Sequence, residues 1–170
     1  MPADRFAWAA ESLDVGPSDA ILEIGCGHGL AVPLVARQLA RGKLLAVDKS
    51  PKMIALAAKR NQALVKSGKV AFEVAAVEDM AGDRRRFSRV FAINVNLFWT
   101  DPSAGFGAVT NLLRPRGWLY LFYQPPSGAQ IDRIAGILSS SLKRHGFVHR
   151  RVLVEAASLL CVRAAAPAEK

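Results

Sequence analysis

Three glycines at alternate positions, Gly25, Gly27 and Gly29, follow a short apolar run and precede an apolar helical pattern. Because glycine has no side chain, backbone N–H groups at such a turn can come close to a ligand. Asp48 stands nineteen residues after Gly29, at the end of a second apolar run. A carboxylate in that place can accept hydrogen bonds from both hydroxyls of a ribose. The combination predicts a site for a nucleoside-bearing cofactor.

The residue after the third glycine narrows the choice of cofactor. A nicotinamide or flavin fingerprint places its third glycine five residues after the first, and this chain has Leu30 at that position. The spacing therefore disfavours a dehydrogenase. A dehydrogenase site and a strand-to-helix turn without a ligand both remain as alternative interpretations.

Composition indicates one packed domain of ordinary size. The chain has 170 residues, of which 51% are hydrophobic and 22% charged, unlike a disordered chain. No apolar stretch approaches the ~20 residues that span a bilayer, and the first ten residues lack the basic-then-apolar order of a signal peptide. Two cysteines, Cys26 and Cys161, are too few for a disulfide framework. We therefore expect a cytoplasmic protein with reduced thiols and no membrane association.

The formal net charge of +9 raises the question of a nucleic-acid partner. Most of the basic residues follow predicted helices: they are Arg41, Lys43, Lys66, Lys69, Arg114, Arg116, Lys143, Arg144, Arg150 and Arg151. The helix dipole stabilises cations there, and in a parallel α/β sheet these turns lie opposite to the edge that binds ligands. The pattern disfavours a nucleic-acid substrate, although the three arginines at residues 84–86 leave a secondary basic patch open.

Strand-like and helical patterns alternate along the chain, which predicts a doubly wound α/β fold with a mostly parallel sheet. Strands are expected at residues 20–24, 44–47, 69–74, 89–95 and 117–123, and helices at residues 4–13, 30–40, 51–64, 102–113 and 130–144. The last apolar runs, 148–155 and 158–163, are separated by only two residues, so they predict an antiparallel hairpin. We expect one domain over residues 1–170, with residues 1–17 as a short N-terminal cap and residues 165–170 as a frayed tail.

With this order of elements, the chain resembles the class I S-adenosylmethionine-dependent methyltransferases over about residues 18–164. Three stretches carry the resemblance: the acid and alternate glycines from Glu23 to Gly29, the acid Asp48 followed by Ser50-Pro-Lys-Met53, and the segment Leu112-Leu-Arg-Pro-Arg-Gly117-Trp-Leu-Tyr. The family fold is a seven-stranded sheet with an antiparallel last strand, which agrees with the predicted hairpin. The resemblance implies S-adenosylmethionine as the cofactor.

The resemblance also implies which residues bind this cofactor. The glycine loop would lie against its amino-acid portion, Asp48 would hold the ribose hydroxyls, and Asn94 would lie beside its ammonium group. Met53 and the backbone around Val77 would meet the adenine. The full set of expected cofactor-binding residues is Glu23, Gly25, Cys26, Gly27, Gly29, Asp48, Lys49, Met53, Val77, Glu78 and Asn94.

Two positions depart from the pattern of the family. Ala76 and Ser88 stand where many members have an aspartate. The amino group of the adenine is then left to Glu78, to Asp79 or to no residue.

The sequence indicates less about the acceptor site than about the cofactor site. Methyl transfer from a sulfonium needs an aligned acceptor more than a fixed catalytic group. No catalytic residue is identified. The acceptor site is expected from residues 96–101, residues 123–128 and the N-terminal helix, with Asn96, Phe98, Trp99, Tyr123 and Gln124 as candidates. Packing under the next helix is an equal alternative for Phe98 and Trp99. The chain also lacks the Asn/Asp-Pro-Pro-aromatic motif with which related enzymes hold a planar nitrogen, which favours a small-molecule acceptor.

Two functional hypotheses from different classes remain. The first is a methyltransferase acting on a small molecule, and the second is a catalytically silent cofactor-binding subunit of a complex. A nucleic-acid methyltransferase is a further alternative, and a homodimer is open because a second subunit could complete the pocket. The sequence disfavours Cys26 as a nucleophile and disfavours His145 and His149 as metal ligands, so no metal is expected.

Overall fold

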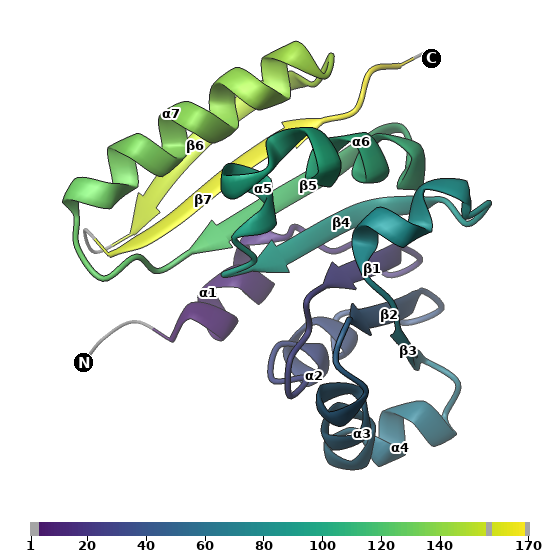
Figure 1. Ribbon diagram of the computed structural model, residues 1–170. Coiled ribbons are helices and arrows are strands. Elements are labelled where there is room, and N and C mark those ends of the chain that lie inside the picture. The colour runs from purple at the N-terminus through teal and green to yellow at the C-terminus, as the bar shows by residue number, and fades with distance from the viewer. Residues whose placement is uncertain (1–3, 156–157, 169–170) are drawn as a thin grey trace.

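Seven strands form one sheet in the part of the chain that the computed structural model describes, residues 4–155 and 158–168 (Figure 1). The strands are β1 Ala20–Ile24, β2 Lys43–Asp48, β3 Val70–Val74, β4 Phe87–Ile93, β5 Leu113–Tyr123, β6 Val148–Glu155 and β7 Leu159–Ala165. Their spatial order is β3-β2-β1-β4-β5-β7-β6. The first five strands pair in parallel, whereas β7 is antiparallel to both β5 and β6. The predicted doubly wound sheet and terminal hairpin are confirmed.

Helices cover both faces of the sheet, and each face has its own hydrophobic core (Figure 1). One face carries α1 Arg5–Ser12, α2 Val32–Ala36 and α3 Pro51–Arg60, which α4 Gln62–Lys66 follows. The other face carries the 3-10 helix η1 Val77–Gly82 with α5 Leu97–Thr100, α6 Pro102–Leu112 and α7 Ala129–Arg144. Neighbouring residues of a strand alternate between the two cores: Leu44 packs on the α1–α3 side and Leu45 on the other.

Two of the expected helix starts form as the sequence indicates. The Ser50 hydroxyl accepts a 3.3 Å hydrogen bond from the Met53 amide, and the Asp101 carboxylate accepts one of 3.3 Å from the Ala104 amide. Each cap is followed by a proline in the first helical turn. These caps fix where α3 and α6 begin, close to the edge of the sheet where parallel strands end.

Two expected helices are shorter than predicted. The helix expected over residues 51–64 breaks at Asn61, whose buried side chain donates hydrogen bonds to the carbonyl oxygens of Gly29 and Ala57 at 3.1 and 2.9 Å. The helix expected over residues 30–40 ends at Ala36. Its continuation is prevented because the amides of residues 40–42 all bond to the Pro17 carbonyl, which turns the chain back toward β2.

The expectation of a frayed tail from residue 165 is wrong for the residues nearest the sheet. Ala165 ends β7, and Ala166 is buried with its amide donating to the Gly117 carbonyl at 2.7 Å. The Pro167 carbonyl in turn accepts from the Arg116 amide. Residues 169–170 lie outside the described part of the chain, as do two of the three residues that connect β6 and β7. Small alanine side chains therefore pack as core at this position.

Basic residues lie where the sequence places them, at the amino edge of the sheet. Lys43 begins β2, Lys69 directly precedes β3 and donates to the Leu39 carbonyl, and Arg114 lies at the start of β5. In the arginine triplet, Arg85 forms ion pairs with Glu73 and Asp83. Within residues 4–155 and 158–168, no helix is long and apolar enough to cross a membrane.

Candidate functional site

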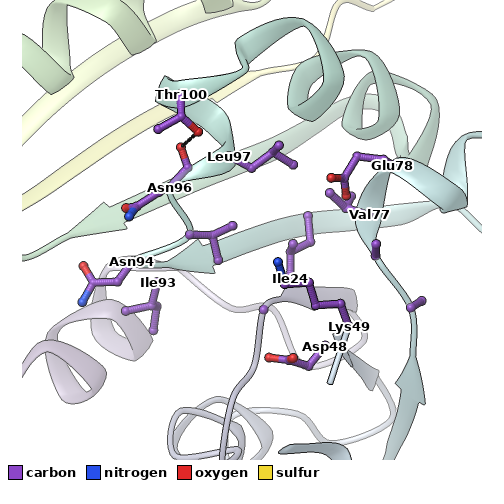
Figure 2. A pocket seen from close by; sticks show the side chains of 14 residues that line it. Ile24, Asp48, Lys49, Val77, Glu78, Ile93, Asn94, Asn96, Leu97 and Thr100 are labelled. Atoms are coloured by element: carbon purple, nitrogen blue, oxygen red, sulfur yellow. Dashed lines mark hydrogen bonds between the residues drawn. The ribbon is translucent and has the colours of Figure 1, made fainter. Parts of the chain in front are cut away.

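A cavity of about 470 Å³ opens where β1, β2 and β4 end and the chain continues into loops (Figure 2). We call it the main cavity. Its lining residues are Ile24, Gly25, Asp48, Lys49, Ala75, Ala76, Val77, Glu78, Ile93, Asn94, Val95, Asn96, Leu97 and Thr100. They include six of the eleven expected cofactor-binding residues, so the carboxyl edge of the sheet brings together sequence positions from residue 24 to residue 100.

Two smaller cavities adjoin the main one. The loop cavity, about 190 Å³, is lined by Arg5, Phe6, Gly25, Cys26, Gly27, His28, Leu30, Ile93 and Asn94. The proline cavity, about 280 Å³, is lined by Asn94, Asn96, Trp99, Tyr123, Gln124, Pro125, Pro126, Gln130 and Ile134. Asn94 borders all three cavities, so they form one connected site around its side chain.

The glycine loop uses its three glycines differently. All three have positive φ angles, of 67°, 52° and 70° in chain order. A Cβ on Gly25 would lie 2.5 Å from Val95 Cγ2, and one on Gly29 would lie 2.8 Å from Asn61 Nδ2. A Cβ on Gly27 would meet nothing within 4 Å. Gly25 and Gly29 therefore permit close packing of the protein itself, whereas the space beside Gly27 is open toward the loop cavity.

Asp48 connects the end of β2 to this loop. Its Oδ2 accepts a 2.9 Å hydrogen bond from the Gly27 amide, and its Oδ1 accepts one of 2.9 Å from the Ser50 amide. A carboxylate oxygen has two lone pairs, so each oxygen can still accept a hydroxyl. The side chain is half-buried and borders the main cavity.

Glu23 is a buried acid two residues before the loop. Its side chain is 3% exposed, and Oε2 has no hydrogen-bond partner. Burial, and secondarily the negative charge of Asp48, raise the pKa of Glu23 to about 8. The carboxyl group is therefore protonated at neutral pH, and it does not line any of the three cavities described above.

Asn94 joins the ends of β4 and β5. It adopts a left-handed conformation with φ of 56°, which asparagine tolerates better than most residues. Its amide N–H donates to the Phe122 carbonyl at 2.8 Å, and its Oδ1 accepts from the Gln124 amide at 2.8 Å. Tyr123 makes a similar link, because its hydroxyl donates to the Val95 carbonyl at 2.7 Å.

The aromatic candidates for the acceptor site differ in burial and in whether they line a cavity. Phe98 is fully buried, and its ring packs edge-to-face against Phe106 at 5.5 Å, so its assignment as an acceptor candidate is wrong. Trp99 is half-buried and lines the proline cavity, where its Nε1 donates to Asn96 Oδ1 at 3.2 Å. Asn96, Tyr123 and Gln124 also line the proline cavity.

Two other expected residues, Met53 and Gly29, do not line the three cavities, whereas Cys26 lines the loop cavity. Met53 is half-buried in the first turn of α3, and Gly29 packs against that helix. Burial raises the pKa of the Cys26 thiol, which agrees with the packing interpretation rather than a nucleophile. His145 packs against Phe106 at the end of α7, whereas His149 lies on β6.

Arg5 is a site residue that sequence reasoning missed. It begins α1, lines the loop cavity and donates from Nη1 to Gln124 Oε1 at 3.1 Å. The partners are 119 positions apart, so no local pattern indicates the contact. Pro125 and Pro126 of the proline cavity fall in the expected segment 123–128 without having been named as candidates, whereas Gln130 and Ile134 of α7 lie outside the expected segments.

A family model described as "Methyltransferase domain" matches residues 21–117 of this chain, which include the glycine loop, Asp48 and Asn94. The chain belongs to the class I S-adenosylmethionine-dependent methyltransferases. Membership makes methyl transfer the reaction class of this methyltransferase and S-adenosylmethionine its cofactor.

Named relatives show how far the likeness extends. The methyltransferase is 27% identical over 152 residues to the protein named "Putative methyltransferase YrhH" of Bacillus subtilis (strain 168), covering 89% of this chain and 81% of the relative. It is 33% identical over 106 residues to the ubiquinone biosynthesis O-methyltransferase of Xanthomonas campestris pv. campestris (strain B100), covering 62% of this chain and 43% of that protein. The methyltransferase thus spans less than half the length of the latter relative.

The fold is also that of a solved structure. A SAM-dependent O-methyltransferase of Thermotoga maritima aligns with a TM-score of 0.78 over 100% of this chain and 67% of its own, at 17% identity. At that identity the likeness establishes the seven-stranded fold of the methyltransferase, not its acceptor.

Proposed function

We propose that this methyltransferase methylates an oxygen of a small molecule, with the cofactor across the main and loop cavities and the acceptor in the proline cavity. The observation that carries the proposal is the meeting of all three cavities at Asn94. A donor and an acceptor that occupy neighbouring cavities can approach each other only at such a junction. The oxygen acceptor is suggested by the name of the Xanthomonas relative.

The main cavity suits the adenosine part of the cofactor. Asp48 has unused lone pairs for the two ribose hydroxyls, and Val77 and Leu97 offer apolar surface for the adenine. Glu78 is exposed on η1 and lines this cavity, whereas Asp79 does not. Glu78 is therefore the better candidate for the amino group of the adenine.

The loop cavity suits the amino-acid part. Gly27 leaves open space there, and the guanidinium of Arg5 offers positive charge for a carboxylate. The open space beside Gly27 and the cation of Arg5 together support the amino-acid part of the cofactor in the loop cavity.

When bound, the sulfonium supplies a methyl group that is already activated for displacement. The residues of the chain then have to hold both partners in line and exclude water, which can supply much of the rate acceleration. Asn94 and Tyr123 contribute by tying the loop after β4 to the end of β5.

Calorimetric titration with S-adenosylmethionine and with NAD tests the cofactor assignment, and methyl transfer from labelled cofactor to a metabolite extract tests the acceptor class. We expect micromolar binding of the former only, and label in small molecules bearing a new O-methyl group. Binding without transfer to small molecules would contradict the proposal and favour a silent cofactor-binding subunit. Label in added RNA or DNA alone would favour a nucleic-acid methyltransferase.

A further inference from the structure

Four amide side chains line the proline cavity, and three of them, those of Asn94, Asn96 and Gln124, have their oxygen atoms occupied within the protein; the fourth, Gln130, is exposed at the start of α7. Asn94 Oδ1 accepts from the Gln124 amide at 2.8 Å, and Asn96 Oδ1 accepts from Trp99 Nε1 at 3.2 Å. Gln124 Oε1 accepts from Arg5 Nη1 at 3.1 Å. Backbone, indole and guanidinium N–H groups can only donate, so each contact fixes the amide oxygen toward its partner.

The NH₂ groups of the same three residues are consequently left for a ligand. None of them donates a hydrogen bond to another residue of the described chain, 4–155 and 158–168. Figure 2 shows the side chains of Asn94 and Asn96 extending the same way from the loop after β4. Each NH₂ group has two donors, and the three residues come from two loops that flank one cavity. The polar surface of the proline cavity is therefore rich in donors.

No Asp, Glu, His or Lys is among the described residues that line the proline cavity. Tyr123 is the titratable group in the lining, and its hydroxyl is engaged with the Val95 carbonyl while burial raises its pKa. The neighbouring cavities contribute Asp48, Lys49 and Glu78 on one side and Arg5, Cys26 and His28 on the other. The lining thus offers no group that is ready to take a proton from an acceptor.

Apart from Gln130 and the engaged hydroxyl of Tyr123, the rest of the proline cavity is apolar and in part flat. The Trp99 indole, Pro125, Pro126 and Ile134 line it. An indole presents a flat apolar face that suits a planar ring, and the volume of about 280 Å³ accommodates a single ring with a substituent.

We infer that the acceptor is a small planar molecule whose nucleophilic oxygen is already an anion when it binds, such as a carboxylate or the phenolate of an acidic phenol. This inference rests on the proposed function. The free amide NH₂ groups would bind the oxyanion, and the guanidinium of Arg5 lies next to them. A lone pair of the oxyanion forms the new C–O bond while the methyl C–S bond breaks and its electron pair stays on sulfur. The two charges cancel and no proton is released, so no general base is required.

Calorimetry with benzoate and benzamide tests the charge preference, because the two probes share a ring and differ in charge. The protein is first saturated with S-adenosylhomocysteine, so that binding is measured without turnover. We expect benzoate to bind at least ten-fold more tightly than benzamide. Equal affinities, or no binding of benzoate at millimolar concentration, would overturn the inference.

The variant Asn96→Asp tests the donor role of the amide. It keeps an oxygen for Trp99 Nε1 but replaces the NH₂ group with an anionic oxygen, so benzoate affinity should fall at least ten-fold while benzamide affinity stays the same. Asn111→Asp is the matched control, because Asn111 is exposed at the far end of α6 and the net charge changes equally. Equal losses in both variants, or none in Asn96→Asp, would contradict the inference.

The cofactor placement and the anionic acceptor fail separately in this experiment. Absence of S-adenosylhomocysteine binding in the first titration would remove the cofactor placement and with it the proposed function. Normal cofactor binding without a preference for benzoate would remove only the anionic acceptor.

Discussion

The backbone amide of Gly27 donates a 2.9 Å hydrogen bond to the carboxylate of Asp48, so the acid at the end of β2 holds the glycine loop that follows β1. The neighbouring Cys26 amide bonds to the Val47 carbonyl at 3.0 Å, which continues the pairing of the two strands into the loop. Asp48 is thus placed both to organise the loop and to meet a ribose, and its removal should affect both.

Asp48→Asn should lower the affinity for S-adenosylmethionine at least ten-fold. The amide has one acceptor oxygen instead of two, so it loses a contact to Gly27 or Ser50 and weakens those to the ribose, each worth about 1.5–3 kcal/mol when charge-assisted. Calorimetry measures the affinity. Asp132→Asn, an exposed aspartate in the first turn of α7, is the control and should bind as the parent does. Unchanged affinity in Asp48→Asn would refute the ribose assignment.

Gly25→Ala should mainly lower the stability of the fold, whereas Gly27→Ala should mainly lower the affinity for the cofactor. Both changes place alanine at positive φ, which costs about 1–2 kcal/mol. At residue 25 the Cβ also meets Val95 Cγ2 at 2.5 Å, so a further overpacking cost of about 1–3 kcal/mol is expected. At residue 27 the space is open, so the fold should survive and cofactor affinity should fall at least ten-fold. Urea unfolding and calorimetry separate the two effects, and normal cofactor binding by Gly27→Ala would contradict the placement of the cofactor's amino-acid part beside Gly27.

Glu23→Gln should change how stability depends on pH. The pKa of Glu23 is raised from 4.5 to about 8 in the folded protein, so between these values the native state binds a proton that the unfolded state has lost. Its contribution to stability is complete below pH 4.5 and is lost as pH rises toward 8, by about 1.4 kcal/mol per pH unit. The variant should lack this slope. Urea unfolding at a series of pH values checks it, with Glu11→Gln, an exposed glutamate of α1, as the control.

Tyr123→Phe should destabilise the protein without altering its pH–rate profile. The change removes the 2.7 Å hydrogen bond to the Val95 carbonyl, worth about 1 kcal/mol. Because the hydroxyl donates to a carbonyl and burial raises its pKa, it is not placed to act as a base. Thermal unfolding tests the loss of stability, and initial rates measured across pH test the unchanged profile. If Tyr123→Phe removed the alkaline part of the pH–rate profile, Tyr123 would have a role in proton transfer.

Glu78→Ala should reduce discrimination for the adenine amino group, whereas Asp79→Ala should not. Glu78 lines the main cavity and Asp79 does not. The suitable comparison is S-adenosylhomocysteine against S-inosylhomocysteine, which carries a carbonyl in place of the amino group. A lost hydrogen bond of about 1 kcal/mol corresponds to roughly five-fold. Equal discrimination in the parent and in Glu78→Ala would leave the amino group without a side-chain partner.

Local signals in the sequence predicted much of the fold. Ser50 and Asp101 cap helices through hydrogen bonds to residues three positions ahead, so the cap can be recognised without knowing the tertiary structure. The break at Asn61 could not be predicted in this way, because one of its partners, Gly29, is 32 positions away.

The residues of the candidate site also differ in whether the sequence alone could predict them. Gly25, Gly27 and Asp48 form a motif in the sequence and lie together around two of the cavities. Phe98 was ambiguous because a large aromatic residue suits a core and a ligand wall equally well, and only its packing against Phe106 separates the two. Arg5 reaches the site through a contact that no spacing rule could indicate.

The shared position of Asn94 limits how this protein can be redesigned. Asn94 and Asn96 both line the main cavity and the proline cavity, and Asn94 also lines the loop cavity, so a change at Asn94 alters the contacts of the donor and of the acceptor at once. Trp99, Pro126, Gln130 and Ile134 border only the proline cavity among the three. Selection for new acceptors can therefore proceed through these four side chains while the handling of the methyl donor is left intact.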